Sequence, residues 1–170
     1  MDEIQIFDNF FDNDIFFEII EYFQNCSWKT NCINRYRAEC ENGDKPFWYV
    51  ILDNDTFFNL KLKSIVETKI GRNIEIERLY AVGQSYCQTS KFHQDSNKSN
   101  FYTLCLYISP QYELCDGNFY IKLPDSKVIL SVEPKVNRCI LFPSHYIHKG
   151  DGYISNTNLR ICVAWKFSVH

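Results

Sequence analysis

Three residues of this chain have the types and spacing of a metal site. His93 and Asp95 are separated by a single residue, and His148 lies much further along the chain. In an extended segment the side chains at positions i and i+2 point to the same side, so a histidine nitrogen and a carboxylate oxygen converge there. A second histidine from a neighbouring strand completes a set of two histidines and one carboxylate, which holds iron(II) and leaves positions open for other ligands. The sequence therefore predicts His93, Asp95 and His148 as metal ligands.

The triplet from His93 to Asp95 is weak evidence by itself. The chain has 4 histidines and 21 acidic residues, so such a triplet also arises by chance in a surface or core position. A second feature strengthens the prediction. Arg160 lies within the apolar segment 159–165, where a buried cation needs an anion beside it. That anion is either a core carboxylate of the protein or the carboxylate of a ligand, which a guanidinium binds through two parallel hydrogen bonds.

Alternation along two apolar segments places Arg160 and Tyr107 on faces that carry small residues. Those residues are Cys162 and Ala164 beside Arg160, and Thr103 and Cys105 beside Tyr107. The opposite faces carry the bulky apolar residues. Because a packed sandwich would place bulky residues on its inner face, we expect Arg160 and Tyr107 to face an interior that takes a small dicarboxylate.

The composition is that of an ordinary globular protein. The chain has 170 residues, of which 45% are hydrophobic and 23% are charged, and its net charge is −3. These values exclude a disordered chain, and the lack of a basic stripe argues against a nucleic-acid partner. No apolar stretch is long enough for a transmembrane helix, so we expect no membrane contact.

The cysteines and the first residues indicate a cytoplasmic, non-secreted protein. The segment 1–4 has neither the basic nor the apolar region that begins a signal peptide. The 8 cysteines lack the paired spacing of a zinc site. We therefore expect reduced cysteines, most of them small core residues.

Hydrophobic periodicity predicts two helices followed by short strands. An apolar stripe at helical spacing follows a capping aspartate at position 12 or 14, and a second helix is predicted over residues 56–70, between Asp55 as N-cap and Gly71 as terminator. Strands are predicted over residues 74–80, 101–109, 118–123, 127–132, 138–142 and 159–167. The expected fold class is mainly β (α+β), with the N-terminal helices packed on one face of an antiparallel sandwich or barrel.

The ordered set of motifs resembles the iron(II)/2-oxoglutarate-dependent dioxygenase superfamily, and within it the prolyl 4-hydroxylase-like branch. The resemblance covers about residues 74–167. It rests, in chain order, on the segment 80–84, His93-Gln94-Asp95, the segment 102–109, Asp116-Gly117-Asn118-Phe119, Leu141-Phe142-Pro143-Ser144, His148 and Arg160. It implies a double-stranded β-helix (jelly-roll) core at about residues 73–168, preceded by a helical part at about 1–72, in a single domain over residues 1–170.

The same resemblance implies the chemistry. Fe(II) is the metal, and 2-oxoglutarate and O2 are cosubstrates in the hydroxylation of a C–H bond, with release of succinate and CO2. By position, Arg160 and Tyr107 bind the distal carboxylate of 2-oxoglutarate, and Tyr80 lines its binding site. The expected partner is a substrate, either a prolyl or other side chain of a protein or peptide, or a small molecule.

His145 is the alternative to His148 as the second histidine ligand. The family places its ligand a few residues beyond the stretch that corresponds to 142–144, and His148 has the better spacing to Arg160. His145 is then a histidine at the surface or beside the site. Two other functions stay open: a catalytically inactive β-helix domain that binds a ligand or protein partner, and a cupin-type metalloenzyme, which would not need Arg160 in an apolar strand.

Overall fold

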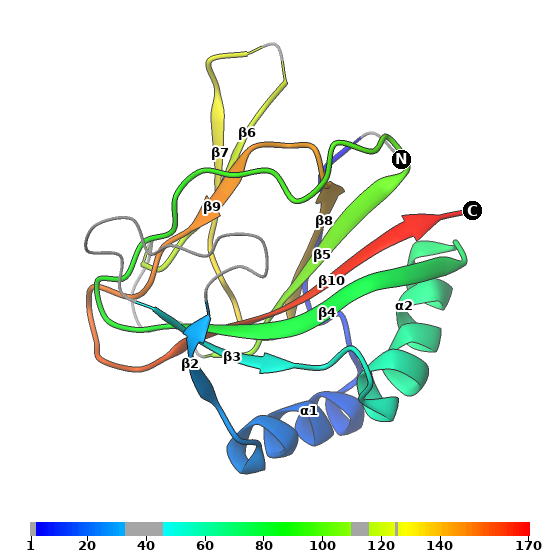
Figure 1. The fold of residues 1–170 in the computed structure, drawn as a ribbon, viewed down its shortest axis with the longest axis horizontal. Helices are drawn as coiled ribbons and strands as arrows, with labels where there is room; N and C mark the ends of the chain where they lie inside the picture. The colour runs from blue at the N-terminus through cyan, green and yellow to red at the C-terminus, as the bar shows by residue number, and fades with distance from the viewer. Residues whose placement is uncertain (1–2, 33–45, 110–115, 125) are drawn as a thin grey trace.

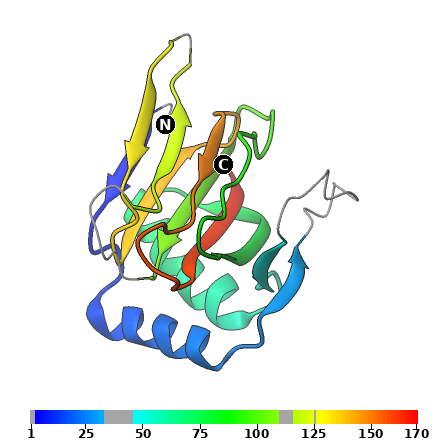
Figure 2. The ribbon, with the colours of Figure 1, turned by 90° about the vertical axis from the view of Figure 1, so that its left-hand side faces the viewer.

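Two antiparallel sheets face each other in the computed structural model, which describes residues 3–32, 46–109, 116–124 and 126–170 (Figure 1, Figure 2). In spatial order, the seven-stranded sheet consists of β1 (Gln5–Phe7), β8 (Arg138–Pro143), β5 (Phe101–Tyr107), β10 (Arg160–Val169), β4 (Ile74–Gln84), β3 (Phe47–Ile51) and β2 (Lys29–Cys32). The three-stranded sheet consists of β7 (Ile129–Val132), β6 (Phe119–Lys122) and β9 (His148–Gly150). This arrangement confirms the predicted mainly β fold with a double-stranded β-helix core.

An irregular segment occupies the fourth position of the small sheet. Two isolated antiparallel bridges, Thr89 to Asp151 and His93 to His148, tie it alongside β9. The bridge at His93 has hydrogen bonds in both directions, from His93 N to His148 O at 3.0 Å and from His148 N to His93 O at 2.9 Å. The segment that carries the predicted metal motif is therefore part of the small sheet, although it does not form a regular strand.

Two helical elements cover the outer face of the large sheet (Figure 1). They are α1 (Asn13–Asn25) and a continuous helix made of a π-helical part, η1 (Phe57–Leu62), and an α-helical part, α2 (Lys63–Ile70). The second helix begins and ends where its sequence signals predict, since Asp55 caps its start and Gly71 ends it with a φ of 66°. No helix in the described parts of the chain combines the length and apolarity needed to cross a membrane.

Strand β10 has two faces that pack into different interiors. Val163, Trp165 and Phe167 belong to the hydrophobic core between the large sheet and the helices. Cys162, on the other face, packs against the second core, where side chains of β5 and β8 meet those of β6 and β7. Arg160 shares the inner face with Cys162, so the alternation predicted from the sequence is present.

Four strands were not predicted from the sequence, namely β1, β2, β3 and β9. They have 3, 4, 5 and 3 residues, which is too short for a period of two to stand out. Three of them lie in the N-terminal part that was expected to be helical and extend the large sheet at its edges. Strand β4 also runs four residues beyond its predicted end, to Gln84.

We predict that the Asp55 cap is worth about 1 kcal/mol of folding stability, because its Oδ1 accepts hydrogen bonds from Phe57 N at 3.0 Å and Phe58 N at 3.2 Å. Its Oδ2 also accepts a hydrogen bond from the Tyr22 hydroxyl at 2.9 Å, which joins α1 to the second helix. Asp55→Ala should lower the free energy of unfolding in a urea titration, whereas Asp55→Asn should retain most of it. Equal stability of Asp55→Ala and the wild type would contradict the prediction.

Candidate metal centre

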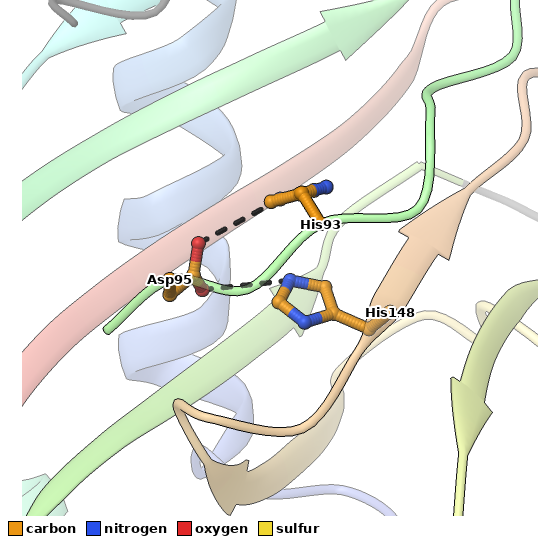
Figure 3. A group of neighbouring side chains, drawn as sticks. All are labelled: His93, Asp95 and His148. Atoms are coloured by element: carbon orange, nitrogen blue, oxygen red, sulfur yellow. Dashed lines mark ion pairs between the residues drawn. The ribbon is translucent and has the colours of Figure 1, made fainter. Parts of the chain in front are cut away.

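The structure brings together the side chains of His148, at the start of β9, and of His93 and Asp95, on the irregular segment beside it (Figure 3). His93 Nε2 lies 3.6 Å from Asp95 Oδ1, and His148 Nε2 lies 3.5 Å from Asp95 Oδ2. One ligand atom from each of the three residues lies within 4.8 Å of the other two. Among the described residues, His93, Asp95 and His148 are the histidine, cysteine or acidic side chains that lie close enough together to hold a metal ion.

Backbone carbonyls orient both imidazole rings. His93 Nδ1 lies 2.9 Å from the Lys91 carbonyl, and His148 Nδ1 lies 2.9 Å from the Tyr146 carbonyl. A carbonyl can only accept a hydrogen bond, so each Nδ1 is the donor and each neutral ring keeps a free electron pair on Nε2. Both Nε2 atoms point at Asp95, which is the orientation that metal-ligating histidines need.

Asp95 is held by donors from several strands. Its side chain is 3% exposed, and its Oδ2 accepts a hydrogen bond from the Thr103 hydroxyl at 2.8 Å. Its Oδ1 forms a short ion pair with the Lys166 ammonium. The Arg78 guanidinium donates to the backbone carbonyl of Asp95 at 3.1 Å. The carboxylate plane is therefore fixed before any metal binds.

The pKa values of Asp95 and His148 favour the ligating forms of these two residues. Burial raises the pKa of Asp95, but Lys166 and the two histidines outweigh burial and lower it to about 2. Burial lowers the pKa of His148 to about 4, with Asp95 acting in the opposite direction. At neutral pH Asp95 is thus an anion and His148 is neutral, which are the states that bind a metal ion.

The site is open on the side of His93. The His93 side chain is 37% exposed, whereas that of His148 is 5% exposed. The side chains of Asp95 and Lys166 are 3% and 7% exposed, so they are buried like that of His148. His93 is therefore the member of the triad that solvent reaches most easily.

Arg160 is buried, and no acidic side chain among the described residues pairs with it. The residue is 2% exposed. Its Nε donates to the Gly117 carbonyl, and its Nη1 donates to Gln84 Oε1 at 2.7 Å. Both acceptors are neutral, and Nη2 has no hydrogen-bond partner among the described residues. Gly150 leaves room for this guanidinium, because an added Cβ would lie 3.2 Å from Nη1.

Tyr107 supplies a second unsatisfied donor next to Arg160. The guanidinium carbon of Arg160 lies 4.9 Å from the centre of the Tyr107 ring. The Tyr107 hydroxyl is buried beside the guanidinium without a hydrogen bond of good geometry in the described structure. Burial raises the pKa of Tyr107, so the hydroxyl is protonated and available as a donor. An anion with planar oxygens would satisfy both groups.

Tyr80 lies nearer to the metal centre than to Arg160. It pairs with Ala164 in the register of β4 and β10, and the Lys166 ammonium lies 5.0 Å from the centre of its ring. Tyr80 and Arg160 therefore stand at different points along the inner face of β10. The cosubstrate role predicted for Tyr80 stays a prediction.

His145 does not join the group of His93, Asp95 and His148. Its backbone carbonyl accepts a hydrogen bond from Gln94 Nε2 at 2.6 Å, and its ring packs edge-on against Tyr146. The hydrogen bond from Gln94 thus connects residue 145 to the segment that carries His93 and Asp95. His148 stands on its own short strand, β9, beyond a turn that follows β8.

Sequence reasoning did not select Lys166, Thr103 and Gln84 as site residues. Lys166 follows Arg160 at even spacing, so the alternation already contained the signal that places it on the inner face. Gln84 carried no such signal, because β4 was expected to end before it. Its contact with Arg160 depends on the pairing of β4 with β10.

Comparison with solved structures gives strong matches over almost the whole chain. An oxidoreductase of the 2OG-Fe(II) oxygenase family from Burkholderia pseudomallei has a TM-score of 0.73 at 11% identity, covering 98% of this chain and 85% of its own. A prolyl hydroxylase from Trichoplax adhaerens, in complex with a peptide fragment of the hypoxia inducible factor oxygen degradation domain, has a TM-score of 0.73 at 15% identity, covering 97% and 83%. HygX from Streptomyces hygroscopicus, with nickel and 2-oxoglutarate bound, has a TM-score of 0.69 at 9% identity, covering 97% and 82%.

The fold is that of the iron(II)/2-oxoglutarate oxygenases. The resemblance seen in the sequence is thereby confirmed at the level of the fold, and the chain has a His-Asp-His triad. No protein-family model matches the sequence, and no curated protein matches it either. At these low identities the oxygenase fold was visible only through the order of a few short motifs and through the structure.

We predict that His148, and not His145, is a metal ligand. Replacing His148 with alanine removes one of the three converging donors, so Ni²⁺ binding measured by calorimetry should become at least ~10-fold weaker. His145→Ala should bind Ni²⁺ like the wild type, because the His145 ring is not among the converging donors. The opposite pattern of affinities would reassign the ligand.

Proposed function

We propose that this chain is an Fe(II)- and 2-oxoglutarate-dependent oxygenase that hydroxylates a C–H bond of its substrate. The overall reaction consumes 2-oxoglutarate, O2 and the C–H substrate, and it yields succinate, CO2 and the hydroxylated product. When bound, the iron together with its cosubstrates supplies the oxidising chemistry. The protein's own residues bind and orient these groups and keep water away from them.

Two buried donors on the inner side of the large sheet carry the proposal. Arg160 Nη2 and the Tyr107 hydroxyl lack partners in the described structure, although both are buried. Buried donors are normally satisfied, and leaving one without a partner costs about 1–3 kcal/mol. A carboxylate accepts from both at once, so these two residues fit the distal carboxylate of 2-oxoglutarate. A metalloenzyme without this cosubstrate would have no need for them.

The triad fits the metal of this reaction. Two neutral imidazoles and one carboxylate leave coordination positions open, and the side chains of Cys162 and Ala164 lie between Arg160 and Lys166 on the inner face of β10. These side chains are small, so little bulk separates the guanidinium from the triad. We assign Arg160 and Tyr107 to the distal carboxylate, and Tyr80 to the wall near the metal.

The substrate class we propose is a protein or peptide side chain, with prolyl among the candidates. The support is the peptide bound to the T. adhaerens prolyl hydroxylase, together with the exposed His93 side of the centre. We place the protein inside the cell. The free thiols of the described cysteines, Cys26, Cys87, Cys105, Cys139 and Cys162, support a reducing compartment.

Succinate release tests the proposed activity. Protein loaded with iron(II) under anaerobic conditions should convert 2-oxoglutarate to succinate once air is admitted, and a pool of peptides that contains the substrate should raise the rate. Asp95→Ala lacks the anionic ligand and should release none. Succinate release that is equal in the wild type and in Asp95→Ala, or absent from the wild type with every peptide and small-molecule pool, would contradict the proposal.

We predict that Arg160 and Tyr107 set the affinity for 2-oxoglutarate. Hydrogen bonds to a charged group contribute ~1.5–3 kcal/mol, so Arg160→Ala should weaken binding by at least ~10-fold, and Tyr107→Phe should weaken it in the same direction. Calorimetric titration of 2-oxoglutarate into Ni²⁺-loaded protein measures both effects. Tyr86→Phe, at an exposed position, is the matched control. Unchanged affinity in Arg160→Ala would make Arg160 a purely structural residue.

A further inference from the structure

Lys166 is a buried cation at the metal centre that the proposed reaction does not use. Its side chain is 7% exposed, and its ammonium forms a short ion pair with Oδ1 of Asp95. Among the described residues no other carboxylate lies within ion-pair distance of it. Lys166 also lies at a bulge, where the register between β10 and β4 shifts. The strand is therefore irregular at the point where this side chain reaches the centre.

Both carboxylate oxygens of Asp95 already have a donor. Oδ1 is bonded to Lys166, and Oδ2 accepts from the Thr103 hydroxyl at 2.8 Å. The same two oxygens face the histidines, at 3.6 Å from His93 Nε2 and 3.5 Å from His148 Nε2. A metal ion at the triad must therefore share an oxygen that already has a hydrogen-bond donor.

The Lys166 ammonium already neutralises the charge of the Asp95 carboxylate. A divalent ion adds two more positive charges in the same buried space. Like charges repel strongly in a partly desolvated site, so Lys166 disfavours the ion that Asp95 attracts.

We propose that Lys166 is a positioning residue that stands in for the metal. It holds Asp95 in its ligating orientation in the metal-free protein, and its charge competes with the metal ion for that carboxylate. Lys166 thereby weakens metal binding, and occupancy of the centre follows the metal concentration around the protein. The inference rests on the metal site of the proposed function, but neither on 2-oxoglutarate nor on catalytic turnover.

Titration of chelator-treated protein with Ni²⁺, followed by calorimetry, tests this role. Ni²⁺ is a suitable probe because it binds such donors more tightly than Fe²⁺. Lys166→Met keeps the length of the side chain and removes its charge, and we expect it to bind Ni²⁺ at least ~10-fold more tightly than the wild type. Lys166→Arg keeps the charge and should stay close to the wild type. Lys61→Met, which removes an exposed ion pair with Glu18, is the matched control and should leave the affinity unchanged.

Thermal unfolding gives a second readout that needs no activity. In the absence of metal, Lys166→Met leaves Asp95 without its ammonium partner and should unfold at a lower temperature than the wild type. Saturating Ni²⁺ should then raise the unfolding temperature of Lys166→Met by more than it raises that of the wild type. If Lys166→Met does not fold, Lys166→Gln is neutral as well and can still donate to Asp95, so the same gain in affinity is expected from it.

The outcomes separate this inference from the proposed function. Unchanged or weaker Ni²⁺ binding in both neutral variants, with normal binding in the wild type, would overturn the competing role of Lys166 and leave the oxygenase proposal intact. Failure of folded wild type to bind Ni²⁺ at all would overturn the metal centre itself, and with it both proposals. The role of Lys166 is supported when Lys166→Met and Lys166→Gln bind Ni²⁺ more tightly than the wild type while Lys166→Arg and Lys61→Met do not.

Discussion

Strand β10 contributes side chains to two different interiors, one on each of its faces, and most of the structure depends on this strand. Its outward face places Val163, Trp165 and Phe167 in the core beneath the helices, where all three are fully buried. Its inward face carries Arg160 and Lys166 towards the space between the sheets. Because successive side chains of a strand point to opposite sides, one stretch of ten residues both anchors the helices and supplies two cations to the candidate site.

The two buried cations on that inward face, Lys166 and Arg160, have different kinds of partner. Lys166 meets a carboxylate, Asp95, in an ion pair between side chains that are 7% and 3% exposed. Within the described ranges, Arg160 donates to the neutral oxygens of Gln84 and Gly117. A buried cation without an anion is costly, so the two environments have different consequences. The first is an ion pair complete within the chain, whereas the second leaves Nη2 of Arg160 without an acceptor among the described residues.

The irregular segment next to β9 determines where the centre opens. Its bridge at His93 is bonded in both directions to His148, so the two histidines are held opposite each other without a regular strand between them. Two residues beyond His93, the backbone N–H of Asp95 donates a hydrogen bond to the Ser144 carbonyl at 2.9 Å. This leaves the His93 side chain partly exposed and the side chains of Asp95 and His148 buried.

Local patterns in the sequence were sufficient for the long elements and for the identity of the candidate ligands. Asp55 and Gly71 mark the ends of the second helix, and the alternation around Arg160 orients β10, because a cap, a left-handed terminator and a period of two are properties of a few neighbouring residues. The strands of three to five residues carry too few alternations to be read in this way, and they form because an existing sheet edge offers them hydrogen bonds. The pairing of Lys166 with Asp95, the neutral partners of Arg160 and the place of Tyr80 near the metal centre were decided by the tertiary structure alone. Each of them joins residues far apart in the sequence, and strand register and the bulge at Lys166 determine which of those residues meet.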